Sequence, residues 1–217
     1  DLLDKILEEK AIETVKKCSK VVFFLSLPEH YESEGYDRKD LSLPKNQIKL
    51  LLKIKKICPN IIVVMQNGSP VEMQDVIRAK GVLETYLLGG VAGEATAKIL
   101  SGKYNPSGKL AESFPLRIED TPCYLSFPGV NDKVRYTEGL FVGYRYYRSK
   151  NIKVAFPFGY GLSYTSFLIK DIKIDKDFLS PNYNPSEIYI ISTNKNRTIM
   201  SAYSQLQGLY SPGMEPD

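Results

Sequence analysis

Residues 61–68 read IIVVMQNG, with five apolar residues in a row before Gln-Asn-Gly. Such a short β-branched run, closed by turn-forming residues, is typical of a buried strand in a parallel sheet. Residues 21–27, VVFFLSL, form a second run of this kind. Between them, residues 43–60 (LPKNQIKLLLKIKKICPN) place apolar side chains at helical spacing, with a proline suited to the first turn and another near the end. The pattern strand, helix, strand predicts an α/β domain with a parallel sheet.

The same alternation continues in both directions along the chain. The expected elements are a helix over residues 1–20, a helix over 70–80, a strand over 81–88 and a helix over 92–100. Right-handed crossovers would place all strand-to-helix loops at one edge of the sheet, where ligands bind in such folds. We expect the loop after residue 27, the Asn67-Gly68-Ser69 sequence and the Gly89-Gly90 pair to meet at that edge.

Beyond residue 103 the character of the sequence changes. Residues 105–108, Asn-Pro-Ser-Gly, predict a turn that leads into a short strand. Residues 120–165 are rich in Tyr, Gly and Pro with little helical period, which predicts ordered loops held by aromatic side chains. Residues 167–175 alternate apolar and polar residues, like the first strand of a β-sandwich.

Composition excludes several classes of function. The 217 residues carry a net charge of only +4, mixed along the chain, which argues against a nucleic-acid-binding protein. No apolar run approaches the roughly 20 residues that span a bilayer, and no signal peptide is recognisable, so the sequence favours the cytoplasm. Three scattered cysteines, interpreted as buried free thiols, and a single histidine predict neither a metal site nor a cofactor.

Residues 32–38, ESEGYDR, concentrate charge in the loop that follows residues 21–27. Glu32, Glu34 and Asp37 are each candidates for acid/base chemistry, because each lies at the expected ligand edge of the sheet. Gly35 allows an unusual turn beside Glu34. Asp37 and Arg38 are expected to fix the loop through an ion pair or hydrogen bonds. The residues alone leave the three carboxylates as alternatives.

Five segments together resemble glycoside hydrolase family 3, in its β-glucosidase branch. They are ESEGYDRKDLSLPKNQ, VVMQNGSPVEM, GGVAGEATAKILSGKYNPSGKLAESFP, GLFVGYRYY and AFPFGYGLSYTSF, and they occur in the family's order. The resemblance covers about residues 10–176 and implies the family's α/β-sandwich domain, a partial (α/β)6 sandwich, over residues 1–166. It also implies the first strand of a fibronectin type III-like domain over residues 167–178.

The resemblance also implies a reaction. Family members are retaining, exo-acting β-glycosidases, chiefly β-glucosidases, that act on β-glucosides or related oligosaccharides without a cofactor. Their nucleophile is an Asp of a separate TIM-barrel domain, and their general acid/base is a Glu of the α/β domain, the two carboxyls being about 5 Å apart. In members with EGYDR the Glu before the Gly has this role, which here is Glu34, with Glu32 as the runner-up.

The sequence departs from the family pattern at its start. The barrel and the front third of the α/β domain have no counterpart, so we expect an N-terminally truncated fragment that holds the acid/base half of an active site and is inactive alone. The alternative is an idle carbohydrate-binding or interaction module.

A second departure is the tail, residues 187–217. Its residues 187–213, EIYIISTNKNRTIMSAYSQLQGLYSPG, resemble a fragment of histidine acid phosphatases, in which Arg197 would bind phosphate. The nucleophilic histidine of that family's Arg-His-Gly motif is missing, so we expect no phosphatase activity. The junction at residues 179–186 is either a true fusion or an assembly artefact, and we favour the artefact.

Overall fold

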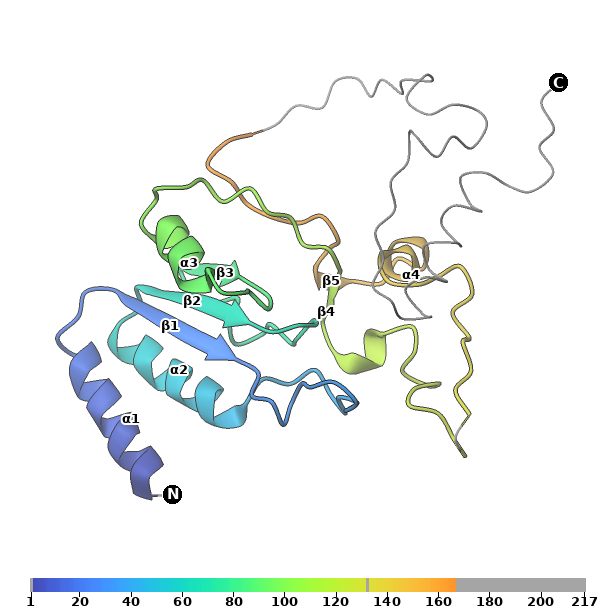
Figure 1. Ribbon diagram of the computed structural model, residues 1–217, viewed down its shortest axis with the longest axis horizontal. Coiled ribbons are helices and arrows are strands. Elements are labelled where there is room, and N and C mark those ends of the chain that lie inside the picture. Colours follow the sequence, from blue (N-terminus) through green and yellow to red (C-terminus); the bar gives the residue numbers. More distant parts are fainter. Residues whose placement is uncertain (1, 132, 167–217) are drawn as a thin grey trace. The chain divides into compact units, whose positions relative to one another are not determined.

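Three parallel strands form the centre of the structure (Figure 1). The computed structural model describes residues 2–131 and 133–166. The strands are β1 (Val21–Ser26), β2 (Ile61–Gln66) and β3 (Gly81–Glu84), in the order β1-β2-β3. Val21 pairs with Ile61, and Ile62 pairs with Gly81, so the carboxyl ends of all three strands lie at one edge. The predicted α/β class with a parallel sheet is confirmed.

Three helices accompany the sheet, as the sequence predicts. They are α1 (Leu2–Val15), α2 (Lys45–Ile57) and α3 (Ala92–Leu100), and α2 and α3 lie on opposite sides of the sheet in Figure 1. Leu51 and Ile54 of α2 belong to one buried cluster with Leu25 and Val63 from the strands. Burial of this apolar stripe stabilises the helix more than its intrinsic propensity does.

The prediction that residues 21–27 form a buried strand is correct for one face only. Val63 and Val64 of β2 are both fully buried, which shows that this central strand is covered on both sides. In β1, Leu25 is 1% exposed whereas Phe24, on the opposite face, is 59% exposed. Among the described residues, α2 covers the face of β1 that carries Leu25 and nothing covers the face that carries Phe24.

The helix predicted over residues 70–80 is wrong, since the segment forms turns. Val71 and Met73 are both buried, and two residues two positions apart cannot occupy the same face of a helix. The backbone N–H of Glu72 donates instead to the carbonyl of Leu41 at 2.8 Å. Contacts with the loop after β1 therefore override the local helical pattern.

The strand predicted over residues 81–88 ends early, at Glu84. Tyr86 has a φ of +53°, a left-handed conformation that an extended strand cannot contain. The Thr85 side chain turns back to donate to the carbonyl of Met65 at 2.6 Å. The acidic end of β3 is thereby held next to the end of β2.

The second half of the described chain holds short elements. They are β4 (Phe114–Pro115), the 3-10 helix η1 (Ile118–Asp120), α4 (Tyr144–Ser149) and β5 (Val154–Phe156), with β4 antiparallel to β5. The short strand predicted after residues 105–108 corresponds to β4. The prediction of loops throughout 120–165 is wrong for α4 and β5, which are too short to show a sequence period.

Several predictions concern residues that the structure does not describe. The fibronectin-like strand over residues 167–178, the tail over 187–217 and Arg197 all lie outside the described residues. The cysteines are free as expected, but only Cys58 is buried and Cys18 is exposed. In the described part of the chain, no helix is long and apolar enough to cross a membrane.

Candidate acid/base site

Glu34 lies at the tip of a tight turn in the loop that follows β1. The Tyr36 N–H donates to the Ser33 carbonyl at 3.4 Å, which closes a four-residue turn. Gly35, the third residue of this turn, has a φ of +76°, as predicted for an unusual backbone at this glycine. A positive φ at the third position is the requirement of type II turns. Glu34 therefore occupies the second position of the turn, with its side chain exposed.

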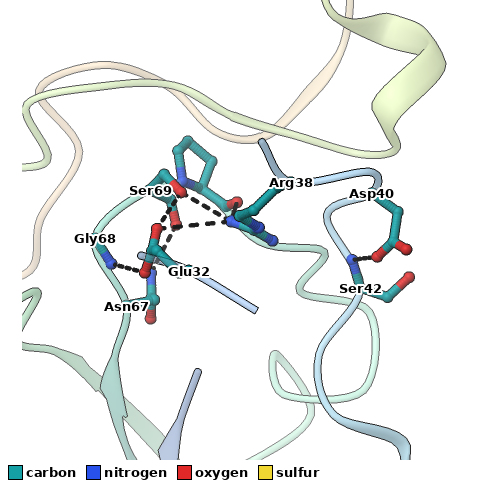
Figure 2. Close-up of polar contacts among 8 residues, drawn as sticks. Glu32, Arg38, Asp40, Ser42, Asn67, Gly68 and Ser69 are labelled. Atoms are coloured by element: carbon teal, nitrogen blue, oxygen red, sulfur yellow. Dashed lines mark hydrogen bonds and ion pairs between the residues drawn. The ribbon is translucent and has the colours of Figure 1, made fainter. Parts of the chain in front are cut away.

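Glu32, by contrast, is bound to the turn that follows β2 (Figure 2). Its Oε2 accepts a hydrogen bond from the Gly68 N–H at 2.7 Å, and its Oε1 accepts one from the Ser69 hydroxyl at 2.6 Å. A Cβ atom at position 68 would lie 3.2 Å from the Glu32 carboxyl carbon. The absence of a side chain at Gly68 is what allows the carboxylate to approach the backbone.

Arg38 ties the other side of the loop to the same turn. Its Nη1 donates to the Ser69 hydroxyl at 2.8 Å and to the Pro70 carbonyl at 3.1 Å, and it lies 4.0 Å from Glu32 Oε1 (Figure 2). Burial lowers the pKa of Arg38, whereas Glu32 and Asp40 raise it. The guanidinium is thus a partly buried cross-link between two loops.

These contacts divide the loop into two parts. We call Glu32, Arg38, Gly68 and Ser69 the loop base, and residues 33–37 between the two anchors the loop crown. Within the described residues, Glu34 and Asp37 of the crown make no hydrogen bond or ion pair. The part predicted for Asp37 in fixing the loop stays a prediction, as does the catalytic assignment of Glu34.

A second group of acidic residues lies near the loop base and consists of Glu84, at the end of β3, and Glu112, in the segment before β4. Burial raises the pKa of Glu84 to about 7, and the nearby Glu112 raises it further against hydrogen bonds from Tyr86, Asn67 and Thr85. Burial also raises the pKa of Glu112, with a smaller contribution from Glu32. Sequence reasoning missed both carboxyls. An acidic residue inside the apolar segment VLETYLL was the available signal for Glu84.

The structure also contains a surface hollow of about 620 Å³ at a different place. It lies between α3 and residues 104–108, and Leu83, Lys98 and Tyr104 are among its lining residues. None of the residues of the loop base or crown lines it. The described residues hold no group of three or more His, Cys, Asp or Glu side chains that could bind a metal ion.

Two family models match the sequence. The model of the glycosyl hydrolase family 3 C-terminal domain matches residues 4–164, which include the loop base, the loop crown and Glu84. The model of the histidine phosphatase superfamily, branch 2, matches residues 159–217. The second match begins before the tail delimited above and lies mostly outside the described residues.

Curated relatives and solved structures are glycosidases. The chain is 50% identical over 182 residues to thermostable beta-glucosidase B of Acetivibrio thermocellus, covering 84% of this chain and 24% of that protein. It is 46% identical over 174 residues to an exo-alpha-(1->6)-L-arabinopyranosidase of Bifidobacterium longum, covering 80% and 23%. The crystal structure of a Bifidobacterium adolescentis GH3 beta-glucosidase matches with a TM-score of 0.72 and 46% identity, over 75% of this chain and 24% of that one. The chain thus spans about a quarter of the length of these relatives.

Proposed function

The chain belongs to glycoside hydrolase family 3, and on this premise we propose that Glu34 is the general acid/base of a retaining, exo-acting β-glucosidase-type reaction. The observation that carries the proposal is the position of Glu34. Its exposed carboxyl stands on a turn whose two flanking residues, Glu32 and Arg38, are bound to the turn after β2 at the carboxyl edge of the sheet.

The reaction assigns two successive tasks to Glu34. In the first step its carboxylic acid donates a proton to the glycosidic oxygen, while an Asp of a TIM-barrel domain attacks the anomeric carbon and the aglycone leaves. In the second step the Glu34 carboxylate takes a proton from the water that hydrolyses the glycosyl-enzyme. A carboxyl that donates protons near neutral pH needs burial or a neighbouring negative charge. The barrel domain and bound substrate would supply both, so we expect this chain alone to be inactive.

Glu32 is poorly suited to the same role. Both of its oxygens accept hydrogen bonds, and the Arg38 guanidinium lies 4.0 Å away. Oxygens that are already held by the turn after β2 are not free to approach a glycosidic oxygen. We therefore propose that Glu32 anchors the loop, together with Arg38, and that Asp37 has only a minor part in it.

The proposed substrate class is a β-glucoside or a related small glycoside with a terminal sugar. The names of the relatives support this class, since they include beta-glucosidases and an exo-acting arabinopyranosidase. The identity of that terminal sugar differs between these names, so the loop after β1 would provide the acid/base chemistry that they share rather than the sugar preference.

The test compares Glu34→Ala with Glu32→Ala in the chain joined to the nucleophile-bearing part of the A. thermocellus relative. We expect Glu34→Ala to lower kcat/KM about 10²- to 10⁴-fold for an alkyl β-glucoside, whose leaving group needs a proton. Dinitrophenyl β-glucoside, which needs no such proton, should be affected far less, and azide should restore turnover. If Glu32→Ala shows this leaving-group and azide signature while Glu34→Ala does not, the assignment of Glu34 is wrong.

The histidine phosphatase match favours no second function. The matched residues 159–217 contain no histidine, so the nucleophile of that chemistry is missing from the segment. We propose that Arg197 has no catalytic partner and that the chain does not hydrolyse phosphate esters. Measurable hydrolysis of p-nitrophenyl phosphate by the purified chain would contradict this.

A further inference from the structure

Three buried side-chain oxygen atoms have no hydrogen-bond partner among the described residues. They are Oδ1 of Asn67, just after β2, Oε2 of Glu84, at the end of β3, and the hydroxyl oxygen of Tyr86. The Asn67 side chain is 1% exposed, and its amide N–H acts on the carboxyl of Glu84, a residue that pairs with Met65 two positions before Asn67. A buried carboxylate oxygen without a donor is costly, and protonation of the carboxyl removes the charge that would need one.

Burial and the neighbouring Glu112 disfavour the ionised form of Glu84, against hydrogen bonds from Tyr86, Asn67 and Thr85 that favour it. Glu112 acts on it from the segment before β4, and Glu112 in turn lies near Glu32 of the loop base. Tyr86, from the exit of β3, is the other titratable neighbour, and its backbone N–H donates to Glu84 Oε1 at 2.8 Å. Within residues 2–131 and 133–166, no cationic side chain contributes to the pKa of Glu84. An ionised Glu84 would therefore add a third negative charge to a partly buried acidic group.

We propose that Glu84 is held as a neutral carboxylic acid beside the Asn67 amide, which makes it a positioning residue for the acid/base loop. This inference deepens the proposed function and rests on the assignment of Glu34. It concerns a residue that does not touch the reacting atoms and acts only through the 67–69 turn.

A short series of contacts links Glu84 to the loop. Asn67 Nδ2 donates to the Ser69 carbonyl at 3.0 Å and thereby shapes the turn (Figure 2). That turn presents the Gly68 N–H and the Ser69 hydroxyl to Glu32, which bounds the loop crown. When Glu84 loses its proton, its carboxylate competes with the Ser69 carbonyl for the amide N–H of Asn67. The turn then loosens, and Glu34 loses its fixed position.

The first experiment measures the proton directly in the 217-residue chain. Carbon-13 NMR of the Glu side-chain carboxyls, assigned with Glu84→Gln, should give a titration midpoint near 7 for Glu84. Glu112→Gln should lower this midpoint, because it removes a neighbouring negative charge. A Glu84 midpoint below 5 would overturn the proposal.

The second experiment measures the consequence for the loop. The chain contains no Trp, so Tyr36→Trp adds a single fluorophore to the loop crown, and His30→Gln removes the only histidine from the titration. We expect acrylamide quenching of this Trp to rise as pH increases through about 7. Glu84→Gln, which stays neutral at every pH, should keep quenching low throughout, whereas Glu84→Ala, which removes the contact with Asn67, should keep it high.

The matched control is Glu94→Gln, which removes an exposed carboxylate of α3 that pairs with Lys98. It should leave the quenching transition unchanged. Glu84 does not position the loop if the quenching transition persists after Glu84→Gln. The same conclusion follows if the chain with only Tyr36→Trp and His30→Gln shows no transition. Neither measurement involves turnover, so both can fail while the kinetic signature of Glu34→Ala still holds.

Discussion

The loop base and the loop crown contain glutamates two residues apart that the fold treats in opposite ways. Glu32 of the base accepts hydrogen bonds at both oxygens and lies near a guanidinium. Glu34 of the crown has no such partner among the described residues and is exposed. The oxygens of Glu32 are occupied by donors that fix the loop. The oxygens of Glu34 remain available to a bound molecule. This contrast separates a structural acid from a candidate catalytic one more clearly than the sequence does.

The loop base is also linked to the buried Glu84. The largest predicted effect is the change in the free energy of unfolding when Glu84 loses its proton. The folded pKa of Glu84 is about 7, above its ordinary value of 4.5, so the native state binds a proton that the unfolded state releases between these pH values. The resulting stabilisation is complete below pH 4.5 and is lost as pH rises through 7. We expect the free energy of unfolding to fall by about 3 kcal/mol over this range, relative to Glu84→Gln.

Urea unfolding followed by circular dichroism at pH 5 and pH 8 measures this difference. Glu112 and Glu72 also have raised pKa values and contribute with the same sign, so only the difference between wild type and Glu84→Gln isolates Glu84. Parallel stability curves for the two proteins would mean that Glu84 is ionised throughout, and the base would then have no protonated support.

Substitution of Arg38 should have the next largest effect on the free energy of unfolding. Together with a substitution in the crown, it compares the two parts of the loop directly. Arg38→Met keeps the apolar stem but leaves the Ser69 hydroxyl and the Pro70 carbonyl without this donor and Glu32 without its ion-pair partner, in a place where the Arg side chain is 13% exposed. We expect a loss of about 2 kcal/mol in the free energy of unfolding. Asp37→Asn, its neighbour in the crown, should change stability by less than about 0.5 kcal/mol. Equal effects at the two positions would remove the distinction between base and crown.

Much of this arrangement could be predicted from the sequence, because it depends on strong local patterns. The apolar run of β2 identifies the central strand, and the order of strands and helices brings the loop after β1 to the carboxyl edge. The expected meeting of that loop with Gly68 and Ser69 at this edge is confirmed by the hydrogen bonds of Glu32.

The remainder depends on contacts between distant residues, which no local pattern reveals. Glu32 and Ser69 are 37 positions apart, and nothing in either segment shows that one accepts a hydrogen bond from the other. Residues 70–80 have helical character locally, but burial of both Val71 and Met73 against the core prevents a helix. Glu84 resembles an ordinary strand residue until the neighbouring segments cover it.

Substitution of Gly68 should have a smaller effect on stability, which arises from packing. A Cβ atom there would lie 3.0 Å from Leu87 Cδ1 and 3.2 Å from the carboxyl of Glu32. Leu87 is 73% exposed and can move, whereas Glu32 is held by its donors. We expect Gly68→Ala to cost about 1–2 kcal/mol and to displace Glu32. Thermal unfolding of Gly68→Ala with and without Leu87→Ala identifies the source, because full recovery in the double variant would place the clash at Leu87 and not in the loop base.

Substitution of Gly35 in the crown should have the smallest effect on stability. Its origin is backbone conformation and not packing. Nothing lies within 4 Å of a Cβ built at Gly35, but its φ of +76° is unfavourable for L side chains. Gly35→Ala should therefore cost about 1 kcal/mol through backbone conformation alone. Gly35→Asn should cost less, because Asn tolerates this region. Chemical denaturation of both variants provides the test. Equal losses for Ala and Asn would show that the crown contacts other parts of the protein at this position, and Glu34 would then be less free than the structure indicates.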